Sequence, residues 1–416
     1  MASAPVPLRV LVLGGSYGGL GAALNLLDLC NGKPTRFSGV LAEEKKPVIP
    51  VQIKVVDERD GYYHIISSPL ALASKDFAAK AWQRFADLPA LRDPGISWIQ
   101  GSTIKVDCER KVATISDRNT GKDFEERYDY LIAATGLRRA WPVVPQTLTK
   151  DEYLIEAGNH IDAVRNAKEG VVVIGGGAVG IEMASELKLC QPKQTVTLIH
   201  SRERLLSSEP LPDEFKDRSL IALEESGVKV ILGLRVTDSE PVETADGSPL
   251  LKLTLSNGSQ INAGHVIKAI SKSVPTSTYL DESLLDTDGY VKVEPSLNFA
   301  PGAPNAKYHF AIGDLAKWSG IKRCGGAFHM GSYAAINIHQ QLLEKMGVKP
   351  NFVALDEYPA MIALAVGKQA VLYGPDDGTT WGRDKMEMMF GEDLGWTICW
   401  NYMKLGVDPS ESIKSM

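Results

Sequence analysis

Two glycine-rich turns, each preceded by an apolar strand and followed by a helix, constrain the fold of this chain more than any other feature. The second turn lies in Val171 to Glu186, VVVIGGGAVGIEMASE, and has the spacing G-x-G-x-x-G. In this motif the first glycine makes the turn, the second lets the backbone approach a pyrophosphate, and the third allows close helix-sheet packing. The free N–H groups at the helix start would face the phosphates. The motif therefore predicts a dinucleotide site that contains Gly175, Gly177 and Gly180.

An earlier copy of the motif occupies Arg9 to Gly19, RVLVLGGSYGG, with Ser16 in place of the middle glycine. A small hydroxyl still lets a pyrophosphate approach, although the contact is looser or differently aimed. The next strand, Gln52 to Val56, ends in Asp57, an acid expected on a ribose, with a solvated turn aspartate as the alternative. The residues predicted for this first site are Gly14, Gly15, Ser16, Gly18, Gly19, Asp57, Glu58 and Arg59.

The strand after the second turn, Thr195 to Ile199, ends at His200, the position that contacts the cofactor ribose. An acid there would accept both hydroxyls of NADH and repel the 2′-phosphate of NADPH. This chain instead continues with Ser201, which can donate to a phosphate, and with Arg202 and Arg204, either of which can pair with it. The alternative is that both arginines are surface charges. The segment predicts NADPH as the preferred donor, with NADH as the second choice.

Two nucleotide sites in one chain imply two dinucleotides. The usual reason to hold both is to pass electrons from one to the other, as in a flavoprotein reduced by a nicotinamide. Many such proteins relay electrons through a disulfide, but no C-x-x-C or C-x-x-x-x-C spacing occurs here, so we expect no redox disulfide. The five cysteines are Cys30, Cys108, Cys190, Cys324 and Cys399.

Size and composition narrow the class of protein and of partner. The 416 residues suggest two or three domains, and the 44% hydrophobic content is that of a globular protein. The net charge of -6, without a basic block, argues against nucleic acid and favours a small diffusible substrate or electron acceptor. No apolar run reaches roughly 18 residues, so we expect no transmembrane segment and a cytoplasmic protein. We expect no metal site.

The rest of the first unit adds two candidate segments. Gly61 to Ala73, GYYHIISSPLALA, suits a loop along a flavin, and His64 in it is either a proton donor near the redox centre or a hydrogen-bonded structural histidine. Ala133 to Gly136, AATG, has small residues that let the backbone pass close to a ligand. We therefore add Thr135 and Gly136 to the cofactor-binding residues.

The pattern of the first unit resumes after the second. Tyr308 to Leu315, YHFAIGDL, is an apolar strand that ends at Gly313 and Asp314, both predicted to bind the cofactor. Cys324 to Gln341 reads as a helix with small residues at its start. A helix whose N-terminus meets a flavin can stabilise the negative charge of the reduced ring.

These patterns predict an α/β fold with two Rossmann-like dinucleotide-binding domains and a small C-terminal α+β segment. The FAD domain is discontinuous, and the NAD(P)H domain is inserted into it. The C-terminal aromatic stripe with Trp396, Trp400 and Met403 fits a core or a dimer interface, so we expect a monomer or a homodimer. The predicted segments are 1–142 for the first part of the FAD domain, 143–275 for the NAD(P)H domain, 276–348 for the second part of the FAD domain, and 349–416 for the C-terminal segment.

Five motifs occur in the order LVLGGSYGG, YLIAATG, VVVIGGGAVGIEMASE, FAIGDLA and MIALAVGKQAV. Together they resemble the pyridine nucleotide-dependent flavoprotein reductases with two dinucleotide domains. Within these the chain is most similar to the apoptosis-inducing-factor-like group that includes ferroptosis suppressor protein, and less similar to type II NADH dehydrogenases. The resemblance covers nearly the whole chain.

The resemblance implies FAD in the first domain and NAD(P)H in the second, with hydride transfer to the flavin followed by reduction of a quinone or similar acceptor. It also implies that Glu182 lies near the nicotinamide, Asp314 on the flavin ribityl chain, and Lys368 at the lysine of the VGK motif. Peripheral contact with a membrane is compatible with the group. The alternatives are an oxidase or cyclisation enzyme for a natural product, and a flavin-stabilised signalling protein.

Overall fold

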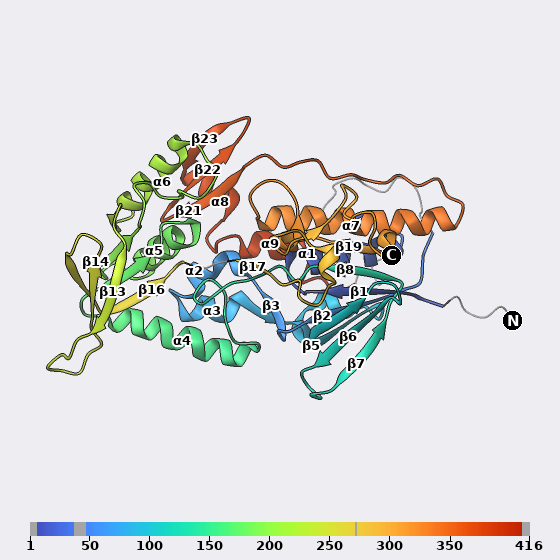
Figure 1. Cartoon of the computed structure of the whole chain (residues 1–416), viewed down its shortest axis with the longest axis horizontal. Coiled ribbons are helices and arrows are strands. Elements are labelled where there is room, and N and C mark those ends of the chain that lie inside the picture. The colour runs from blue at the N-terminus through green and yellow to red at the C-terminus, as the bar shows by residue number, and fades with distance from the viewer. Residues whose placement is uncertain (1–5, 37–46, 271–272, 410–416) are drawn as a thin grey trace.

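The computed structural model of the chain describes residues 6–36, 47–270 and 273–409. Two α/β units lie side by side along the long axis of the molecule (Figure 1). Each unit has a parallel sheet whose central strand leads into one of the two glycine-rich turns. The predicted fold class is thereby confirmed.

The first unit is centred on a seven-stranded sheet with the order β19-β8-β1-β2-β5-β6-β7. The strands from β19 to β5 are parallel, and β6 and β7 add an antiparallel extension. Its main elements are β1 (Leu8–Leu13), α1 (Tyr17–Cys30), β2 (Val51–Asp57), β5 (Ile96–Asp107), β6 (Val112–Asp117), β7 (Asp123–Arg127), β8 (Tyr130–Ala133), β19 (His309–Ala311) and α7 (Cys324–Lys345).

Strand β1 is buried on both faces, as expected for the centre of a parallel sheet. Val10 and Val12 belong to a core cluster formed with α1 and α7. Leu11 and Leu13 point to the other face, into a cluster that includes Ile115 of β6. The apolar run from Val10 to Leu13 follows from this double burial, because each of these four side chains meets a covered face.

The first unit is completed by chain that follows the second unit. Strand β19 pairs in parallel with β8, and the two crossings between units, β9 (Leu137–Arg138) and β17 (Val274–Pro275), pair with each other. Two short strands, β18 (Val291–Lys292) and β20 (Ala316–Lys317), lie in the returning segment. This topology has the discontinuous order expected from the sequence, while the proposed segment boundaries stay a prediction.

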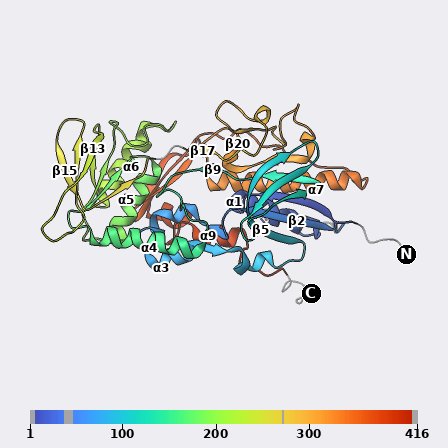
Figure 2. The same cartoon turned by 60° about the horizontal axis from the view of Figure 1, so that its bottom comes forward.

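The second unit contains a parallel sheet in the order β12-β11-β10-β16 and an antiparallel sheet in the order β13-β14-β15. Helix α4 precedes both sheets and runs alongside α3 of the first unit (Figure 2). The elements are α4 (Lys150–Asn166), β10 (Val171–Ile174), α5 (Ala178–Cys190), β11 (Val196–Ile199), α6 (Asp213–Glu225), β12 (Lys229–Ile231), β13 (Val236–Pro241), β14 (Leu251–Leu255), β15 (Gln260–Ala263) and β16 (His265–Lys268).

The segment between β2 and β5 carries the contact between the two units. Trp82 stacks on Tyr153 of α4, with ring centroids 5.2 Å apart, and both are fully buried in one cluster with residues of α5 and α6. An apolar interface of this kind holds the two sheets in a defined relation. Its elements are β3 (Gly61–Tyr63), α2 (Ser68–Ala71), α3 (Lys75–Ala81) and β4 (Trp82–Arg84).

The C-terminal segment contributes to the cores of both units. Leu364 and Val371 lie in the cluster with α5 and α6, whereas Cys399 and Met403 lie in the cluster with α1 and α7. Figure 1 shows the hairpin strands above the second unit and α9 beside α1. The elements are β21 (Ile362–Val366), β22 (Gln369–Gly374), β23 (Gly378–Gly382), α8 (Arg383–Met389) and α9 (Trp396–Tyr402).

Candidate active site

The first glycine-rich turn joins β1 to α1 in a conformation that depends on its glycines. Gly14 has φ +104°, and a side chain there would overlap the carbonyl oxygen of Ala134. A side chain at Gly19 would overlap the carbonyl oxygen of Gly14, so Gly19 lets α1 pack directly on the turn. Ser16 is the N-cap residue of α1, and its hydroxyl caps no N–H of this described helix. The helix start therefore keeps donors for an anionic group.

Asp57 ties this turn to the end of β2. Its carboxylate accepts from the Gly15 N–H at 2.6 Å and from the Arg59 N–H at 2.8 Å. Burial raises the pKa of Asp57, and the nearby Arg59 and the two N–H donors oppose that shift. The residue predicted to contact the ribose thus also holds the turn in place.

The second glycine-rich turn has the same backbone geometry as the first. Gly175 has φ +123°, and a side chain at Gly180 would overlap the Gly175 carbonyl oxygen. Gly177 is the N-cap residue of α5, and a β-carbon there would meet no described atom within 4 Å. The backbone at Gly177 is therefore open to a ligand at the start of α5, whereas Gly180 is required by packing.

His200 takes the place at the second turn that Asp57 has at the first. Its Nδ1 accepts from the Gly176 N–H at 3.1 Å, and its Nε2 lies 3.2 Å from the hydroxyl of Ser207. Because Nδ1 accepts, the proton of the neutral ring is on Nε2. Burial lowers the pKa of His200, which favours the neutral ring. The sequence located this position but did not indicate the hydrogen bond to the turn.

The arginines after β11 differ in their surroundings. Ser201, Arg202 and Arg204 are all exposed, but Arg204 is paired with Asp213 and Asp217 of α6. No described carboxylate is paired with Arg202. Of the two guanidinium groups, that of Arg202 is the one available to a phosphate at the end of β11.

The structure brings the predicted residues of the first site to one edge of the sheet. Gly14 follows β1, Asp57 ends β2, Thr135 follows β8, and Gly313 follows β19. The four strands are parallel, so their carboxyl ends lie at the same edge, where dinucleotides bind in such sheets. Residues far apart in the chain therefore meet at one edge of the sheet.

The small residues after β8 also hold the crossing between the units. The Thr135 hydroxyl donates to the carbonyl of Thr276 at 2.9 Å, and the Gly136 carbonyl accepts from the Thr276 N–H at 3.1 Å. Asp314 pairs with Arg139 at 3.2 Å, with about a quarter of each side chain exposed. Thr135, Gly136 and Asp314 thus lie where the chain passes from one sheet to the other.

Glu58 and Arg59 contact the same crossing. The Glu58 carboxylate accepts two hydrogen bonds from the guanidinium of Arg138, at 2.6 Å and 3.0 Å. The Arg59 guanidinium lies 3.5 Å from the carbonyl of Pro145. Both side chains after Asp57 therefore have partners within the protein and connect the first site to the crossing.

Glu182 lies in the second turn of α5, next to β21 of the C-terminal segment. Its carboxylate accepts from the backbone N–H of Ala365 in β21 at 3.2 Å. Burial raises the pKa of Glu182 to about 8. The side chain can therefore hold a proton near neutral pH, five residues after the N-cap of the helix that begins the second dinucleotide site.

Comparison with known proteins identifies the family of this chain. The sequence profile of the pyridine nucleotide-disulphide oxidoreductases matches residues 8–331. The chain belongs to this family. Its match runs through both glycine-rich turns and ends in α7, so it includes the discontinuous first unit.

Individual proteins that are similar to this chain support the same family assignment. The chain is 55% identical over 411 residues to Oxidoreductase OXR1 of Ajellomyces capsulatus, which covers 97% of this chain and 89% of that protein. It is 26% identical to Ferroptosis suppressor protein 1 of Mus musculus, over 88% of this chain and 94% of that protein. The solved structure of NDH2 from Plasmodium falciparum in complex with NADH has the same fold, with a TM-score of 0.65 at 14% identity, covering 97% of this chain and 98% of that one.

Family membership confirms three expectations from the sequence. The chain is a pyridine nucleotide-dependent flavoprotein oxidoreductase, its relatives include the ferroptosis suppressor proteins and an apoptosis-inducing factor homologue, and its cofactors are FAD with NAD(P)H. None of the helices in the described part of the chain has the length and apolar character needed to cross a bilayer.

The residues of both turns fit the two dinucleotides of the family. At Gly14 and Gly19 the backbone packs too closely for side chains, which leaves the strand-to-helix turn bare. At Gly177 the space is open, as a pyrophosphate requires. The electrostatic partners differ between the sites, since a carboxylate lies at the first and an imidazole at the second.

His64 is fully buried, and hydrogen bonds occupy both of its ring nitrogens. Nδ1 lies 3.1 Å from the hydroxyl of Tyr17 and 2.9 Å from that of Tyr62, and Nε2 lies 3.1 Å from the carbonyl of Leu394. Since a carbonyl only accepts, Nε2 carries the proton. Burial lowers the pKa of His64 to about 4. These contacts favour the structural alternative over the proton donor.

The structure does not bring Lys368 to the sheet edges where the two glycine-rich turns lie. Lys368 is exposed in the turn between β21 and β22, where a side chain at Gly367 would meet Ser226 and where Gln369 donates to Glu225. Those partners end α6 and precede β12, at the amino edge of the second parallel sheet. Dinucleotides bind at the carboxyl edge, so these contacts do not support the catalytic role of Lys368, which stays a prediction.

The expected absence of a redox disulfide stays a prediction, although two cysteines far apart in the sequence lie in contact. Cys324 is the first residue of α7 and Cys399 lies in α9, and their side chains are hydrogen-bonded to each other. The two residues are too distant in sequence for a spacing motif to reveal them. The structure describes all five cysteines as free thiols.

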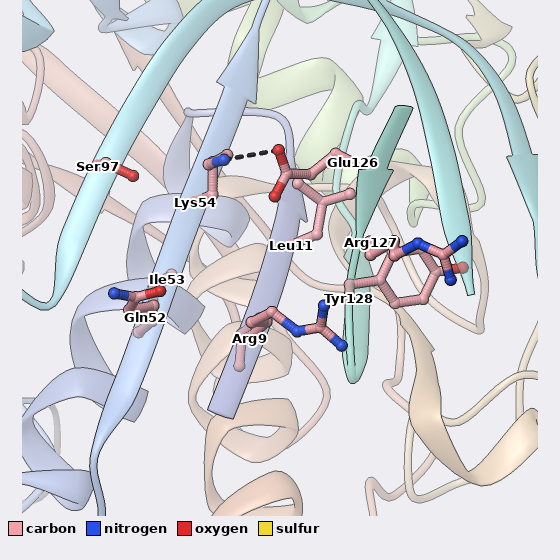
Figure 3. Close-up of a pocket in the computed structure, with 10 residues that line it drawn as sticks. Arg9, Leu11, Gln52, Ile53, Lys54, Ser97, Glu126, Arg127 and Tyr128 are labelled. Atoms are coloured by element: carbon pink, nitrogen blue, oxygen red, sulfur yellow. Dashed lines mark hydrogen bonds and ion pairs between the residues drawn. The ribbon is translucent and has the colours of Figure 1, made fainter. Parts of the chain in front are cut away.

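Two cavities lie away from the glycine-rich turns. The first has a volume of about 40 Å³ and is lined by residues of β1 and β2 and by the ion pair between Lys54 and Glu126 (Figure 3). It is far smaller than a dinucleotide site, which needs several hundred Å³. The second, of about 560 Å³, is lined by the 241–251 segment and by His265 at the amino edge of its sheet. Neither cavity is a candidate for the cofactors.

Proposed function

We propose that this chain transfers hydride from NADPH to FAD and passes the electrons to a quinone or a similar small organic acceptor. The observation that carries the proposal is the pair of matching turns, one in each parallel sheet, each held by the side chain that ends the next strand, Asp57 and His200. A chain with two such sites serves electron transfer between two dinucleotides.

Bound FAD would supply the redox-active ring, and the chain would position it. Asp57 accepts from the ribose hydroxyls, the N–H groups after Ser16 face the pyrophosphate, and Asp314 lies on the ribityl side. Glu182 holds a proton at its carboxyl group near the nicotinamide, because its burial raises the pKa to about 8. Thr135 and Gly136 hold the crossing that keeps the two sheets together.

NADPH is the proposed donor because the end of β11 has no carboxylate in the ribose position. A neutral His200 does not repel the 2′-phosphate, and the free guanidinium of Arg202 can pair with it. Arg204 contributes less, since its guanidinium already pairs with Asp213 and Asp217.

A quinone is the proposed acceptor because the chain resembles quinone-reducing flavoproteins and because its C-terminal segment is rich in exposed apolar groups. Such groups suit an apolar acceptor or a membrane surface from which one is drawn. The exposed large apolar residues of this segment include Trp381, Met388, Met389, Ile398 and Tyr402.

Steady-state oxidation of NADPH with a panel of quinones tests the proposal. Turnover of about 1 s⁻¹ or faster, the lower end of typical enzymes, is expected with at least one quinone. Flavin that is bleached by NADPH but reoxidised by no quinone would instead support an oxidase or cyclisation enzyme for a natural product. Reduction that is slow with every acceptor would favour the signalling alternative.

Electrons are proposed to reach the acceptor without passing through cysteines. The test is a protein with Cys324→Ser and Cys399→Ser that folds and retains flavin. Its quinone reduction should stay within about threefold of the unmodified protein, because no thiol takes part in direct transfer. A loss of a hundredfold or more would show a route through the thiols.

A further inference from the structure

Three lysines from different parts of the chain lie around the ring of Tyr308. The Nζ atoms of Lys111, Lys307 and Lys345 lie 3.4 Å, 4.9 Å and 5.2 Å from the centre of that ring. Lys111 directly precedes β6, Lys307 lies in the turn before β19, and Lys345 ends α7. We call these three residues the lysine cluster. The cluster concentrates positive charge in a chain whose net charge is -6.

Side-chain contacts hold the lysine cluster in place. The ring of Tyr130, the first residue of β8, packs edge-on against Tyr308 with ring centroids 5.3 Å apart. Its hydroxyl accepts from the Lys345 Nζ at 3.3 Å and donates to the Gln341 side chain at 3.1 Å. Gln341 in turn donates to the Lys307 carbonyl at 3.0 Å. The ammonium groups therefore converge on a framework of packed rings and hydrogen bonds.

No carboxylate of the described ranges, 6–36, 47–270 and 273–409, forms an ion pair with the lysine cluster. Asp129 is near enough to act on Lys111, but its carboxylate is paired with the Arg9 guanidinium, at 3.0 Å and 3.2 Å. Like charges that lie within about one Debye length, roughly 10 Å at 0.1 M salt, repel one another. The cluster therefore has an excess of positive charge that the described side chains do not neutralise.

The positive charge of the cluster also acts on its own members and on Tyr308. The hydrogen bond from Lys307 and the charges of the cluster lower the pKa of Tyr308, although burial opposes this shift. Burial, with the other two charges of the cluster, lowers the pKa of Lys111 against the opposing effects of Tyr308 and Asp129. Both shifts have the direction expected where a negative charge is favoured and a further positive charge is not.

The cluster lies at the edge of the first sheet opposite to the predicted cofactor site. Tyr130 begins β8 and Tyr308 directly precedes β19, so the cluster is at the amino ends of these two parallel strands. Gly14 and Gly313 follow the carboxyl ends of β1 and β19, where dinucleotides bind. A cation at the C-terminal end of α7 complements the helix dipole, which accounts for Lys345 but not for the other two lysines. The phosphates of the cofactors therefore do not explain the cluster.

We propose that the lysine cluster binds a phosphate monoester, in a site separate from both predicted dinucleotide sites and independent of the proposed electron transfer. Each ammonium group has three N–H donors, and a phosphate monoester offers three terminal oxygens that share nearly two negative charges at neutral pH. A carboxylate offers one charge and two oxygens, so it neutralises three cations less well. The same phosphate group occurs in free glycerol phosphates and in the headgroup of phosphatidic acid, and binding measurements separate these two sources.

Calorimetric titration of the holoprotein with glycerol 3-phosphate tests the site, with excess NADP⁺ present so that the dinucleotide sites are filled. The double variant with Lys307→Gln and Lys345→Gln should bind the ester more weakly, by about fivefold or more, because two of three exposed ion pairs are lost. Retained flavin absorbance shows that this variant is folded. Lys105→Gln removes an exposed lysine of β5 as a matched control and should keep the original affinity.

Cosedimentation with phosphatidylcholine vesicles that contain phosphatidic acid tests the lipid source. Binding to these vesicles, but neither to pure phosphatidylcholine nor to glycerol 3-phosphate, would assign a lipid headgroup, whereas binding of the soluble ester alone would assign a free phosphate. In either case the ligand should slow acetylation by acetic anhydride at Lys111, Lys307 and Lys345 and leave Lys105 unchanged. An affinity that the double variant retains, protection that does not include the cluster, or binding of neither ligand would overturn the proposal.

Discussion

Asp57 and His200 make the same hydrogen bond at the two turns but carry different charges. Each accepts from the second N–H of its turn, from Gly15 at 2.6 Å and from Gly176 at 3.1 Å. A carboxylate at the first turn suits ribose hydroxyls, whereas a neutral imidazole at the second tolerates an added phosphate. One side chain at each turn thus holds the local structure, and we propose that the same side chain contacts the ribose of the cofactor.

Removal of the Asp57 carboxylate should release flavin. Asp57→Ala loses the ribose contact and the acceptor for the Gly15 N–H, at about 1.5 to 3 kcal/mol for a charged hydrogen bond, or roughly 10- to 150-fold in affinity. The flavin absorbance that remains after dilution and gel filtration measures this. Asp57→Asn, which keeps an acceptor oxygen, should retain more flavin than the alanine variant. Full flavin occupancy in Asp57→Ala would show that the ribose contact lies elsewhere.

Arg202 should decide the preference for NADPH. Arg202→Ala removes a charge-assisted contact of about 1.5 to 3 kcal/mol, so reduction by NADPH at limiting concentration should slow roughly 10- to 150-fold while reduction by NADH changes little. Stopped-flow flavin reduction with each donor measures it. Arg204→Ala is the matched control, with a smaller effect because Asp213 and Asp217 already hold that guanidinium. Equal reduction by both donors in all three proteins would refute the preference.

Glu182 should make the protein less stable as the pH rises. Its pKa is raised from 4.5 to about 8 by burial, so between these values the folded state binds a proton that the unfolded state does not. Stability is therefore lost as the pH rises toward about 8. Glu182→Gln should remove part of this loss, by a few kcal/mol, since each unit of pKa is worth about 1.4 kcal/mol.

Urea unfolding at several pH values measures this effect. The gain in unfolding free energy of Glu182→Gln over the unmodified protein should grow until about pH 8. For the neighbouring Glu186→Gln it should level off near pH 7, because burial raises the pKa of Glu186 only to about 7. A gain that does not change with pH would mean that Glu182 is ionised in the folded protein.

The helices α1 and α5 begin in the same way. Each follows a glycine-rich turn whose last glycine has no room for a side chain. A β-carbon at Gly19 or Gly180 would overlap the carbonyl oxygen of the first glycine of its own turn. The middle position differs, since Gly177 faces open space. The third glycine thus serves packing, and the middle one serves the ligand.

Two alanine variants separate these roles. Gly180→Ala should destabilise the protein by about 1 to 3 kcal/mol, because the new methyl group overpacks the turn. Gly177→Ala should keep the unfolding midpoint within about 2 °C but weaken NADPH binding, because the methyl group enters the ligand space. Thermal unfolding and NADPH titration of both variants measure the two effects. Tight NADPH binding by Gly177→Ala would place the pyrophosphate away from this turn.

Across the molecule, the C-terminal segment joins the two units. Its hairpin packs on α5 and α6, its last helix packs on α1, and the backbone of β21 donates to Glu182. A segment shared by both cores limits how far the sheets can move apart. Packing of α9 in the core of the first unit also brings Cys399 into contact with Cys324 at the start of α7.

Two methionines of this segment allow a matched test of its role. Met403 is fully buried in the core with α1 and α7, whereas Met388 is 59% exposed in α8. Met403→Ala should lower the unfolding free energy by about 2 to 5 kcal/mol, and Met388→Ala should change it by less than about 0.5 kcal/mol. Denaturant unfolding measures both. Similar values for the two variants would mean that α9 does not contribute to the first core.

The fold and the two glycine-rich turns could be predicted from sequence because their constraints are local. A tight turn between a buried strand and a helix needs glycines at set spacings, and the next strand must end beside that turn. Gly14, Gly175, Asp57 and His200 were found in this way. Contacts between distant elements, such as the hydrogen bond from Ala365 to Glu182, depend on tertiary packing and cannot be predicted from the local sequence pattern.

Local sequence patterns could not predict the surroundings of Lys368, Cys324 and Cys399. A resemblance of motif assigned Lys368 to catalysis, yet the direction of the β21–β22 hairpin carries it to the amino edge of the sheet. No spacing rule could pair Cys324 with Cys399, because their contact arises only when α9 packs into the core of the first unit. Backbone geometry is restricted over a few consecutive residues and so can be read along the chain, whereas contact between side chains on separate elements depends on how complete surfaces fit together.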